Sequence, residues 1–222
     1  MANQNYDNIK TNQISMYQND KKLIELLDKL NPAPVIRYAH IHANGEVGVD
    51  GRHSYSKIGV VLQDYTDRSK KTRRVNANLD PEEVKYIYSY LAYRCIPGAD
   101  TFEYTSDKIF GAPDETGKSS VTKMRIARQP LRKDKDGNMV KSKYPWYIEV
   151  TTGKATPIST DKGGKYYEGT SFEQTDKIFV NLSDFDMFSL FSKAVSFINV
   201  FEQCYGASLI SAAFTMNEGG SQ

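Results

Sequence analysis

The sequence predicts an α+β protein made of two strand–strand–strand–strand–helix repeats, in which antiparallel sheets carry the helices on one face. Residues 176–182 alternate between apolar and polar side chains, as a half-buried strand does, and lead directly into a long apolar helix at 184–205. Residues 74–79 alternate in the same way and lead into a second helix that begins at Pro81. Strand-like segments and turns precede both units, so the same order of elements occurs twice.

The chain divides into an N-terminal region at 1–34, a single domain of two pseudo-repeats at 35–98 and 101–206, and a tail at 207–222. The first 20 residues are polar and rich in Asn and Gln, which is typical of a disordered segment. A short helix is expected next, because four apolar residues recur at helical spacing: Leu23, Ile24, Leu27 and Leu30. Two prolines follow and end this helix.

The first pseudo-repeat is expected to open with a hairpin whose strands lie at 35–43 and 46–49. Asn44–Gly45 between them is the dipeptide best suited to a two-residue primed turn. Two further strands are predicted at 57–65 and 73–79, and the first helix follows them directly.

Start signals mark both helices. Asp80 can cap the first helix, Pro81 fits its first helical position, and Glu83 can complete a capping box. Ser183 can cap the second helix in the same manner. The apolar surface of that helix, at 184–205, is broader than one sheet face needs, which predicts a homo-oligomer assembled through it.

The second pseudo-repeat contains strands predicted at 101–110, 121–128 and 144–151, before the strand at 176–182. Residues 134–138 look like a fragment of a calcium loop, but a lysine stands where such a loop needs its glutamate. We therefore expect a hairpin turn there, and we expect the protein to use no metal ion or cofactor.

Charge is nearly balanced over the whole chain, with a formal net charge of +2 at pH 7. The N-terminus shows no signal peptide, and no segment approaches the roughly 20 apolar residues of a membrane span. Two cysteines far apart in such a chain are typical of reduced, buried thiols. These features favour a cytoplasmic protein.

Basic and aromatic residues are interleaved in the segments 57–74 and 118–147, and again near residue 165. A protein that binds single strands without sequence preference needs this mixture, because cations contact phosphates and aromatic rings stack on bases. The candidate nucleic-acid-binding residues are Arg68, Lys70, Lys71, Arg73, Arg74, Lys123, Arg125, Arg128, Lys143, Tyr144, Trp146, Tyr147, Lys165 and Tyr167. The expected binding surface is the helix-free sheet face with its basic hairpins. Tyrosines also pack well on sheets, and Trp146 could equally belong to a core.

Two histidines alternate on a predicted strand, so His40 and His42 could hold one metal ion. This resembles the histidine–hydrophobe–histidine motif of rolling-circle replication endonucleases and relaxases, which use a tyrosine nucleophile on a helix. The tyrosines of the first helix are Tyr86, Tyr88, Tyr90 and Tyr93. However, the lysine expected three residues after that tyrosine is missing. A metal-dependent nicking endonuclease is the alternative, and two histidines on the polar side of an edge strand are the simpler interpretation.

The doubled unit with its basic and aromatic strands resembles the Whirly and Pur-alpha type of single-stranded nucleic-acid-binding proteins, over residues 35–205. The lysine-rich signature of Whirly strands is not recognisable, so no binding residue transfers by motif. Segments 107–111 and 144–149 also look similar to uncharacterised proteins from plasmids, phages and integrative elements of Gram-positive bacteria. The resemblance implies a non-enzymatic protein of a mobile genetic element. It would bind single-stranded DNA with low sequence specificity, and RNA is a further candidate ligand.

A protein-interaction or virion-assembly module is the remaining alternative. In that case the oligomerising helices are the functional part, and the basic strands are only solvated. Salt-dependent binding of single strands would separate this alternative from nucleic-acid binding.

Overall fold

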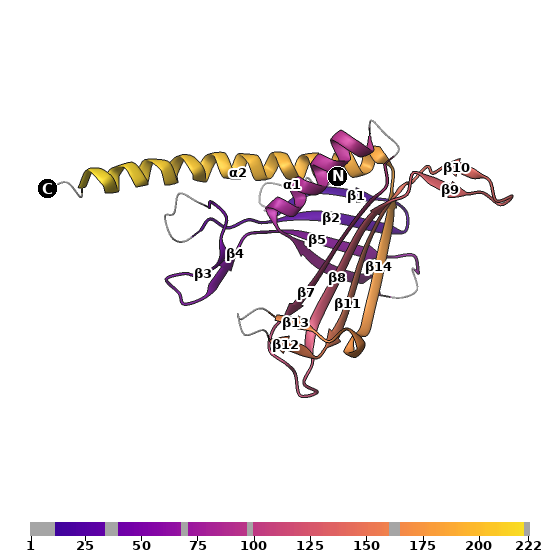
Figure 1. Ribbon diagram of the computed structural model, residues 1–222, viewed down its shortest axis with the longest axis horizontal. Coiled ribbons are helices and arrows are strands. Elements are labelled where there is room, and N and C mark those ends of the chain that lie inside the picture. The colour runs from indigo at the N-terminus through magenta and orange to yellow at the C-terminus, as the bar shows by residue number, and fades with distance from the viewer. Residues whose placement is uncertain (1–11, 34–39, 68–70, 97–99, 160–164, 220–222) are drawn as a thin grey trace, which may run out of the picture.

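The structure is a computed structural model that describes residues 12–33, 40–67, 71–96, 100–159 and 165–219, with only the backbone for Lys165 and 212–219. Two four-stranded antiparallel sheets and two α-helices form its body, so the α+β class and the doubled order of elements are confirmed. In Figure 1 the strands of the two sheets run in different directions, and the longer helix extends far beyond the body.

Each sheet is a meander whose strands follow one another along the chain before a helix begins. The strands of sheet 1 are β1 (Gln13–Gln18), β2 (Lys22–Lys29), β5 (Lys57–Asp64) and β6 (Arg73–Leu79). The strands of sheet 2 are β7 (Phe102–Phe110), β8 (Ser119–Arg128), β11 (Trp146–Ala155) and β14 (Glu173–Leu182). Helix α1 (Pro81–Tyr90), which a π-helical turn at Leu91–Cys95 extends, follows sheet 1, and α2 (Asp184–Gly219) follows sheet 2.

Three short hairpins are inserted between the long strands. They are β3 (Asn44–Val47) with β4 (His53–Tyr55), β9 (Leu131–Lys133) with β10 (Met139–Lys141), and β12 (Pro157–Ser159) with β13 (Lys165–Tyr167). The predicted hairpin turn at 134–138 is confirmed, since it joins β9 to β10. Figure 1 shows the β9–β10 hairpin standing away from the body, at the end opposite to the protruding part of α2.

One hydrophobic core joins the inner faces of both sheets to the helices. Cross-strand pairing sets Ile24 beside Leu62 in sheet 1 and Ile148 beside Val180 in sheet 2, and all four side chains are buried. Buried residues of both helices, such as Phe191 of α2, belong to the same cluster. Both helices therefore lie on the core side of the sheets.

The predicted N-terminal helix is wrong, because its residues form strand β2. Ile24 and Leu26 point into the core, while Leu23 and Leu27 lie half-buried on the other face. Apolar side chains on both faces of a strand produce a spacing that also fits a helix. The first repeat begins still earlier, at β1, within the region predicted to be disordered; residues 1–11 lie outside the described residues.

The predicted turn at Asn44–Gly45 is also wrong. These residues lie in β3, where Gly45 has a φ of +96° at an irregularity in the pairing with β4. The chain reverses in the following loop, where Gly51 has a φ of +75°, a conformation that favours glycine. Most of the strand predicted at 35–43 lies outside the described residues.

Both predicted helix starts are confirmed. The backbone N–H of Asp80 donates to Glu83 Oε2 over 2.6 Å, which is the glutamate half of a capping box. The hydroxyl of Ser183 accepts the backbone N–H of Asp186 over 3.1 Å. These bonds fix the direction in which each helix leaves its sheet.

The second helix is longer than predicted, because α2 continues to Gly219 and the predicted tail at 207–222 is helical up to that residue. Its first turns are covered by the core, whereas the turns at 199–211 are largely exposed. Cys204 lies on this later part and is exposed, contrary to the prediction, while Cys95 is buried as expected.

Candidate nucleic-acid interface

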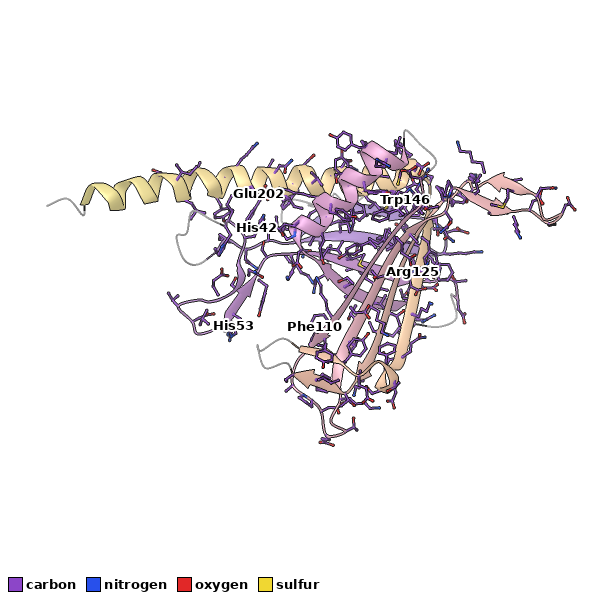
Figure 2. All side chains as sticks on the ribbon, in the orientation of Figure 1. His42, His53, Phe110, Arg125, Trp146 and Glu202 are labelled. Atoms are coloured by element: carbon purple, nitrogen blue, oxygen red, sulfur yellow. The ribbon has the colours of Figure 1, made fainter. Side chains whose placement is uncertain are left out.

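Two predicted binding residues, Arg128 and Trp146, are buried, so this part of the prediction is wrong. The register of sheet 2 sets them opposite each other on the inner face. Arg128, which is 3% exposed, donates from Nε and Nη2 to the two carboxylate oxygens of Asp184, each over 3.0 Å. Trp146 Nε1 donates to the same carboxylate over 2.8 Å. Figure 2 places Trp146 near the start of α2, and Arg125 farther along the strands of sheet 2.

This cluster ties the first turn of α2 to the sheet. Burial alone would raise the pKa of the Asp184 carboxyl, but the hydrogen bonds from Arg128 and Trp146 outweigh it, and the pKa is lowered. The carboxylate therefore stays charged opposite the buried guanidinium. A cation held in this way supports the fold and is not available to a phosphate.

The outer face of sheet 2 neutralises its own charge. Arg125 Nε contacts Glu103 Oε1 at 2.8 Å on the neighbouring strand, and Lys177 Nζ contacts Glu149 Oε2 at 2.6 Å. Both pairs are side by side in the sheet, because Glu149 lies opposite Arg125 in the register. A phosphate on this face would have to compete with carboxylates already in place. The face is therefore a weaker anion surface than its basic residues suggest.

The far end of this face is covered by the segment that contains β13. Lys123 Nζ lies 5.2 Å from the ring centroid of Tyr167 and 3.9 Å from that of Phe172. The Tyr167 hydroxyl donates to Asp107 Oδ2 over 2.5 Å. A side chain at Gly153 would meet the Phe172 ring at 2.6 Å, so a glycine allows this close contact. Lys123 and Tyr167 thus contact each other instead of presenting a free surface.

The predicted cations at 68–74 have different surroundings. Arg73 forms an ion pair with Asp176 of β14. Lys71 and Arg74 are exposed and have no ion-pair partner among the described residues. The other predicted cations cannot be placed, because they lie outside the described side chains: Arg68, Lys70 and Lys165.

An exposed aromatic groove lies where the edge strand β14 meets the turn between β1 and β2. We call it the β14 groove; its volume is about 350 Å³, and it is lined by Tyr17, Asn19, Asp20, Lys21, Lys22, Tyr144, Phe179, Val180 and Asn181. Phe179 is 38% exposed and Tyr144 is 46% exposed. The ring of Tyr147 is stacked on Phe179 with 5.2 Å between centroids, so the predicted residues Tyr144 and Tyr147 both contribute to this region.

Cations surround the rings of the β14 groove. Lys22 Nζ lies 4.1 Å from the ring centroid of Phe179 and 3.4 Å from Asp64 Oδ2. Lys143 Nζ lies 5.2 Å from the ring centroid of the exposed Tyr144. Lys21 lines the same groove from the adjoining turn. The groove therefore combines the two kinds of group that the sequence led us to expect, but at a place other than the sheet face.

The β9–β10 hairpin, residues 131–141, leaves the body next to this groove, and we call it the arm. Its cations are exposed, and none of them forms an ion pair with a described carboxylate: Arg132, Lys133, Lys135 and Lys141. The acid at the base of its turn, Asp134, accepts the backbone N–H groups of Asp136 and Asn138. The arm thus presents exposed positive charge, of which Lys141 also acts electrostatically on the Asp184 carboxylate.

Of the aromatic and basic residues that line the β14 groove, sequence reasoning missed four, namely Tyr17, Lys21, Lys22 and Phe179. A signal for Phe179 was present, because the alternation that points Ile178 and Val180 inward must point Phe179 outward. The other three residues lie in the segment that was predicted to be disordered or helical, so no strand pattern could assign them to a surface.

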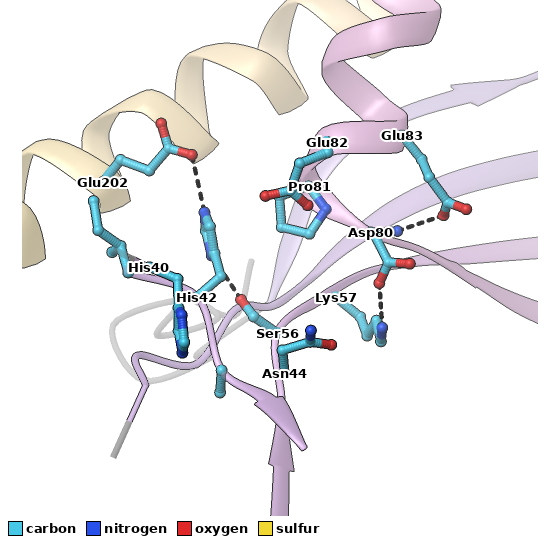
Figure 3. A pocket seen from close by; sticks show the side chains of 12 residues that line it. His40, His42, Asn44, Ser56, Lys57, Asp80, Pro81, Glu82, Glu83 and Glu202 are labelled. Carbon is cyan, nitrogen blue, oxygen red and sulfur yellow. Dashed lines mark hydrogen bonds and ion pairs between the residues drawn. The ribbon is translucent and has the colours of Figure 1, made fainter. Parts of the chain in front are cut away.

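The two histidines lie in a separate pocket of about 680 Å³ beside the start of α1. His42 Nε2 contacts Glu202 Oε1 at 3.0 Å, and its Nδ1 contacts the hydroxyl of Ser56 at 2.8 Å (Figure 3). His40 Nε2 contacts Glu46 Oε1 at 2.6 Å. Each imidazole is therefore engaged by its own carboxylate, on different elements.

This arrangement does not form the metal site of the endonuclease alternative. Among the described residues, no group of three or more His, Cys, Asp and Glu side chains converges on one point. Three of the candidate nucleophiles pack elsewhere: the rings of Tyr86 and Tyr90 contact Phe102, and the ring of Tyr88 contacts Phe188. The fourth, Tyr93, is exposed on the π-helical turn. His42 instead holds α2 against the β3–β4 region, with its ring stacked on Phe201.

Comparison with known proteins assigns no family. No protein-family model and no curated protein matches the chain. Among solved structures, the chain is similar to the crystal structure of WHY3 from Arabidopsis thaliana, with 10% sequence identity and a TM-score of 0.40, over 94% of this chain and 96% of that one. A likeness at this level identifies neither the family nor the ligand of this protein. No helix in the described part of the chain has the length and apolar character to span a membrane.

Proposed function

We propose that this protein binds single-stranded nucleic acid, with single-stranded DNA as its main ligand, in the β14 groove. The observation that supports this most is the exposure of two aromatic rings, Phe179 and Tyr144, inside a groove that Lys21, Lys22 and Lys143 surround. Unpaired bases stack on such rings, and the cations contact the phosphates on either side.

Stacking on Phe179 requires the ammonium of Lys22 to move aside. A cation–π contact at an exposed site contributes about 0.5–1 kcal/mol, whereas a base stacked on an aromatic side chain contributes about 1–3 kcal/mol. The exchange is therefore favourable, and Lys22 then keeps its ion pair with Asp64. The opposite face of the ring stays supported by Tyr147.

Low sequence specificity follows from the same mechanism, because every base has a face that can stack. Single strands are preferred over duplex in the groove, since paired bases do not present their faces to a side chain. We assign no chemical step to the protein and place its activity in the cytoplasm. Service to a mobile genetic element, and binding of RNA, stay predictions.

The test is fluorescence anisotropy with a labelled single strand of about 30 nucleotides and the matching duplex, at low and moderate salt. The proposal expects single strands to bind more tightly than duplex, with an affinity that falls steeply as salt rises. Phe179→Ala should weaken this binding. The matched control is Phe185→Ala, which removes another exposed phenylalanine, at the start of α2, that does not line the groove. No binding at low salt, or equal effects of both variants, would refute the proposal.

Self-association through α2 is a second part of the proposal. Phe191 and Ile198, within the predicted interface 184–205, are buried in the core of the same chain. The large apolar residues of α2 that remain exposed are Phe185, Phe197, Val200 and Tyr205 within that range, and Ile210 beyond it. Exposed apolar side chains in this number favour a contact between copies. Sedimentation velocity should show an oligomer that Val200→Glu dissociates, and a monomer at all concentrations would exclude this part.

A further inference from the structure

The arm has one face that alternates cations with exposed aliphatic side chains. Cross-strand pairing sets Met139 opposite Lys133 and Lys141 opposite Leu131, and residues two apart on a strand share a face. Leu131 is 48% exposed and Met139 is 58% exposed. Two large apolar side chains thus stand in solvent between two lysines that have no described ion-pair partner.

We propose that the arm binds double-stranded nucleic acid next to a single strand held in the β14 groove. The preferred ligand is then a junction, a duplex that continues into a single-stranded overhang. This inference rests on the proposed function, because it uses the groove to hold the single-stranded side.

The arm and the groove offer different chemistry. The groove contains three of the aromatic rings described above, which only unpaired bases can stack on. The arm contains no aromatic residue, so it cannot stack on bases in that way. Its lysines and arginine suit a phosphate backbone, which a duplex presents on both of its strands. The two elements therefore fit the two halves of a junction.

The shape of the arm fits a duplex as well. A two-stranded ribbon can enter the major groove, and exposed Leu or Met side chains are used elsewhere as wedges against base steps in the minor groove. Figure 1 shows the arm standing clear of both sheets. An aliphatic pair that served only folding would be expected in the core, where large apolar side chains such as Ile126 and Ile148 are covered.

The two elements are joined at Tyr144. This residue lines the groove, and it follows the last strand of the arm by three positions, with Lys143 between them. A single strand of nucleic acid whose unpaired bases stack on Tyr144 therefore lies directly beside the arm. The point where the duplex opens would lie at this residue.

The experiment compares three labelled ligands in anisotropy titrations: a single strand of about 20 nucleotides, a duplex of about 20 base pairs, and that duplex with the same strand as an overhang, in both polarities. The wild-type protein should bind one of the overhang ligands about tenfold more tightly than the single strand, as two or three added phosphate contacts would produce. Equal affinity for the overhang ligand and the single strand would overturn the inference.

Two double variants locate the effect. Lys133→Gln with Lys141→Gln should remove most of the tenfold gain and leave single-strand affinity within about twofold, because these lysines lie outside the groove. Leu131→Ser with Met139→Ser tests the aliphatic wedge and should reduce the gain without changing the slope of affinity against salt. The matched control, Arg52→Gln with Lys193→Gln, removes two cations of other elements, the β3–β4 hairpin and α2, and should keep the gain.

The outcomes distinguish the inference from the proposed function. If the wild-type protein binds no single strand, the proposed function fails and the inference fails with it. If it binds single strands but gains nothing from the duplex, or if the arm variants keep the full gain, only the inference fails. In that second case the exposed aliphatic pair would be assigned to a contact with another protein.

Discussion

Two basic–aromatic pairs that are close in sequence have opposite roles in this protein. Arg128 and Trp146 lie in the core, where they share the carboxylate of Asp184. Lys143 and Tyr144 lie at the surface, beside the β14 groove. The composition of the two pairs is nearly the same. The register of sheet 2 turns Arg128 and Trp146 inward. Lys143 and Tyr144 precede the first residue of β11 and therefore lie outside the sheet. A cation next to an aromatic ring therefore indicates a binding surface only where the ring itself is exposed.

The largest effect should come from breaking the buried pair. Arg128→Ala leaves Asp184 partly buried without its partner, which typically costs about 3–5 kcal/mol, and the partial exposure of Asp184 favours the lower end. Urea unfolding should show this loss of stability. Lys143→Ala, the surface counterpart, should change the free energy of unfolding by less than about 0.5 kcal/mol. A small effect of Arg128→Ala would mean that the cluster is not structural.

Acid should weaken the same cluster. The pKa of Asp184 is lower in the folded protein than its unfolded-state value of about 3.9, so its contribution to stability is present above that value. The contribution is lost as the pH falls through the lowered folded-state pKa. The stability difference between wild type and Asp184→Asn should therefore be largest near neutral pH and shrink below about pH 4. A difference that is constant with pH would contradict this assignment.

The groove rings should affect binding rather than stability. Tyr144→Ala removes one stacking surface worth about 1–3 kcal/mol, so single-strand affinity should fall roughly 5- to 150-fold. The thermal unfolding midpoint should hardly move, because Tyr144 is exposed. Trp146→Phe is the matching change at the buried aromatic residue, and it should lower stability instead. Both variants are to be measured by anisotropy and by thermal unfolding.

A smaller effect is expected from one groove cation. Lys143→Gln removes one phosphate contact, which should reduce the slope of log affinity against log salt by about 0.7 for a single strand. The change in affinity should be largest at low salt and fade as salt rises. An unchanged slope would show that Lys143 does not contact the backbone of the ligand.

The smallest effect should be that of Arg125, although the sequence made it a strong candidate. Its guanidinium is held by Glu103 on the sheet face, so Arg125→Gln should change single-strand affinity by less than about twofold. Removing the acid should do more than removing the base: Glu103→Gln would free Arg125 and strengthen binding slightly. A large loss from Arg125→Gln would return the interface to the sheet face.

The repeat could be predicted from the sequence because its signals are local. Alternation in residues 176–182 and the start signals at Asp80 and Ser183 depend on neighbours within a few positions, and the structure confirms all three. The N-terminal strands could not be predicted in this way. β2 is apolar on both faces, so only its pairing with β5 decides between helix and strand.

The candidate site was predicted only in part for a related reason. Tyr144 and Lys143 were found, but the groove also needs Tyr17 of β1 and Lys22 of β2, about 120 residues earlier in the chain. Such a surface is created by the packing of β14 beside the β1–β2 turn. The burial of Arg128 could not be predicted either. Its partner Asp184 has the position of an ordinary acidic residue in the first turn of a helix, which needs no buried partner.

Ultraviolet cross-linking of a bound single strand, followed by mass-spectrometric mapping, tests the central claim most directly. The account predicts that cross-links gather on the β14 groove, at Tyr17, Tyr144 and Phe179. Cross-links concentrated instead on the far end of the outer face of sheet 2, at Tyr167 and Phe172, would contradict it.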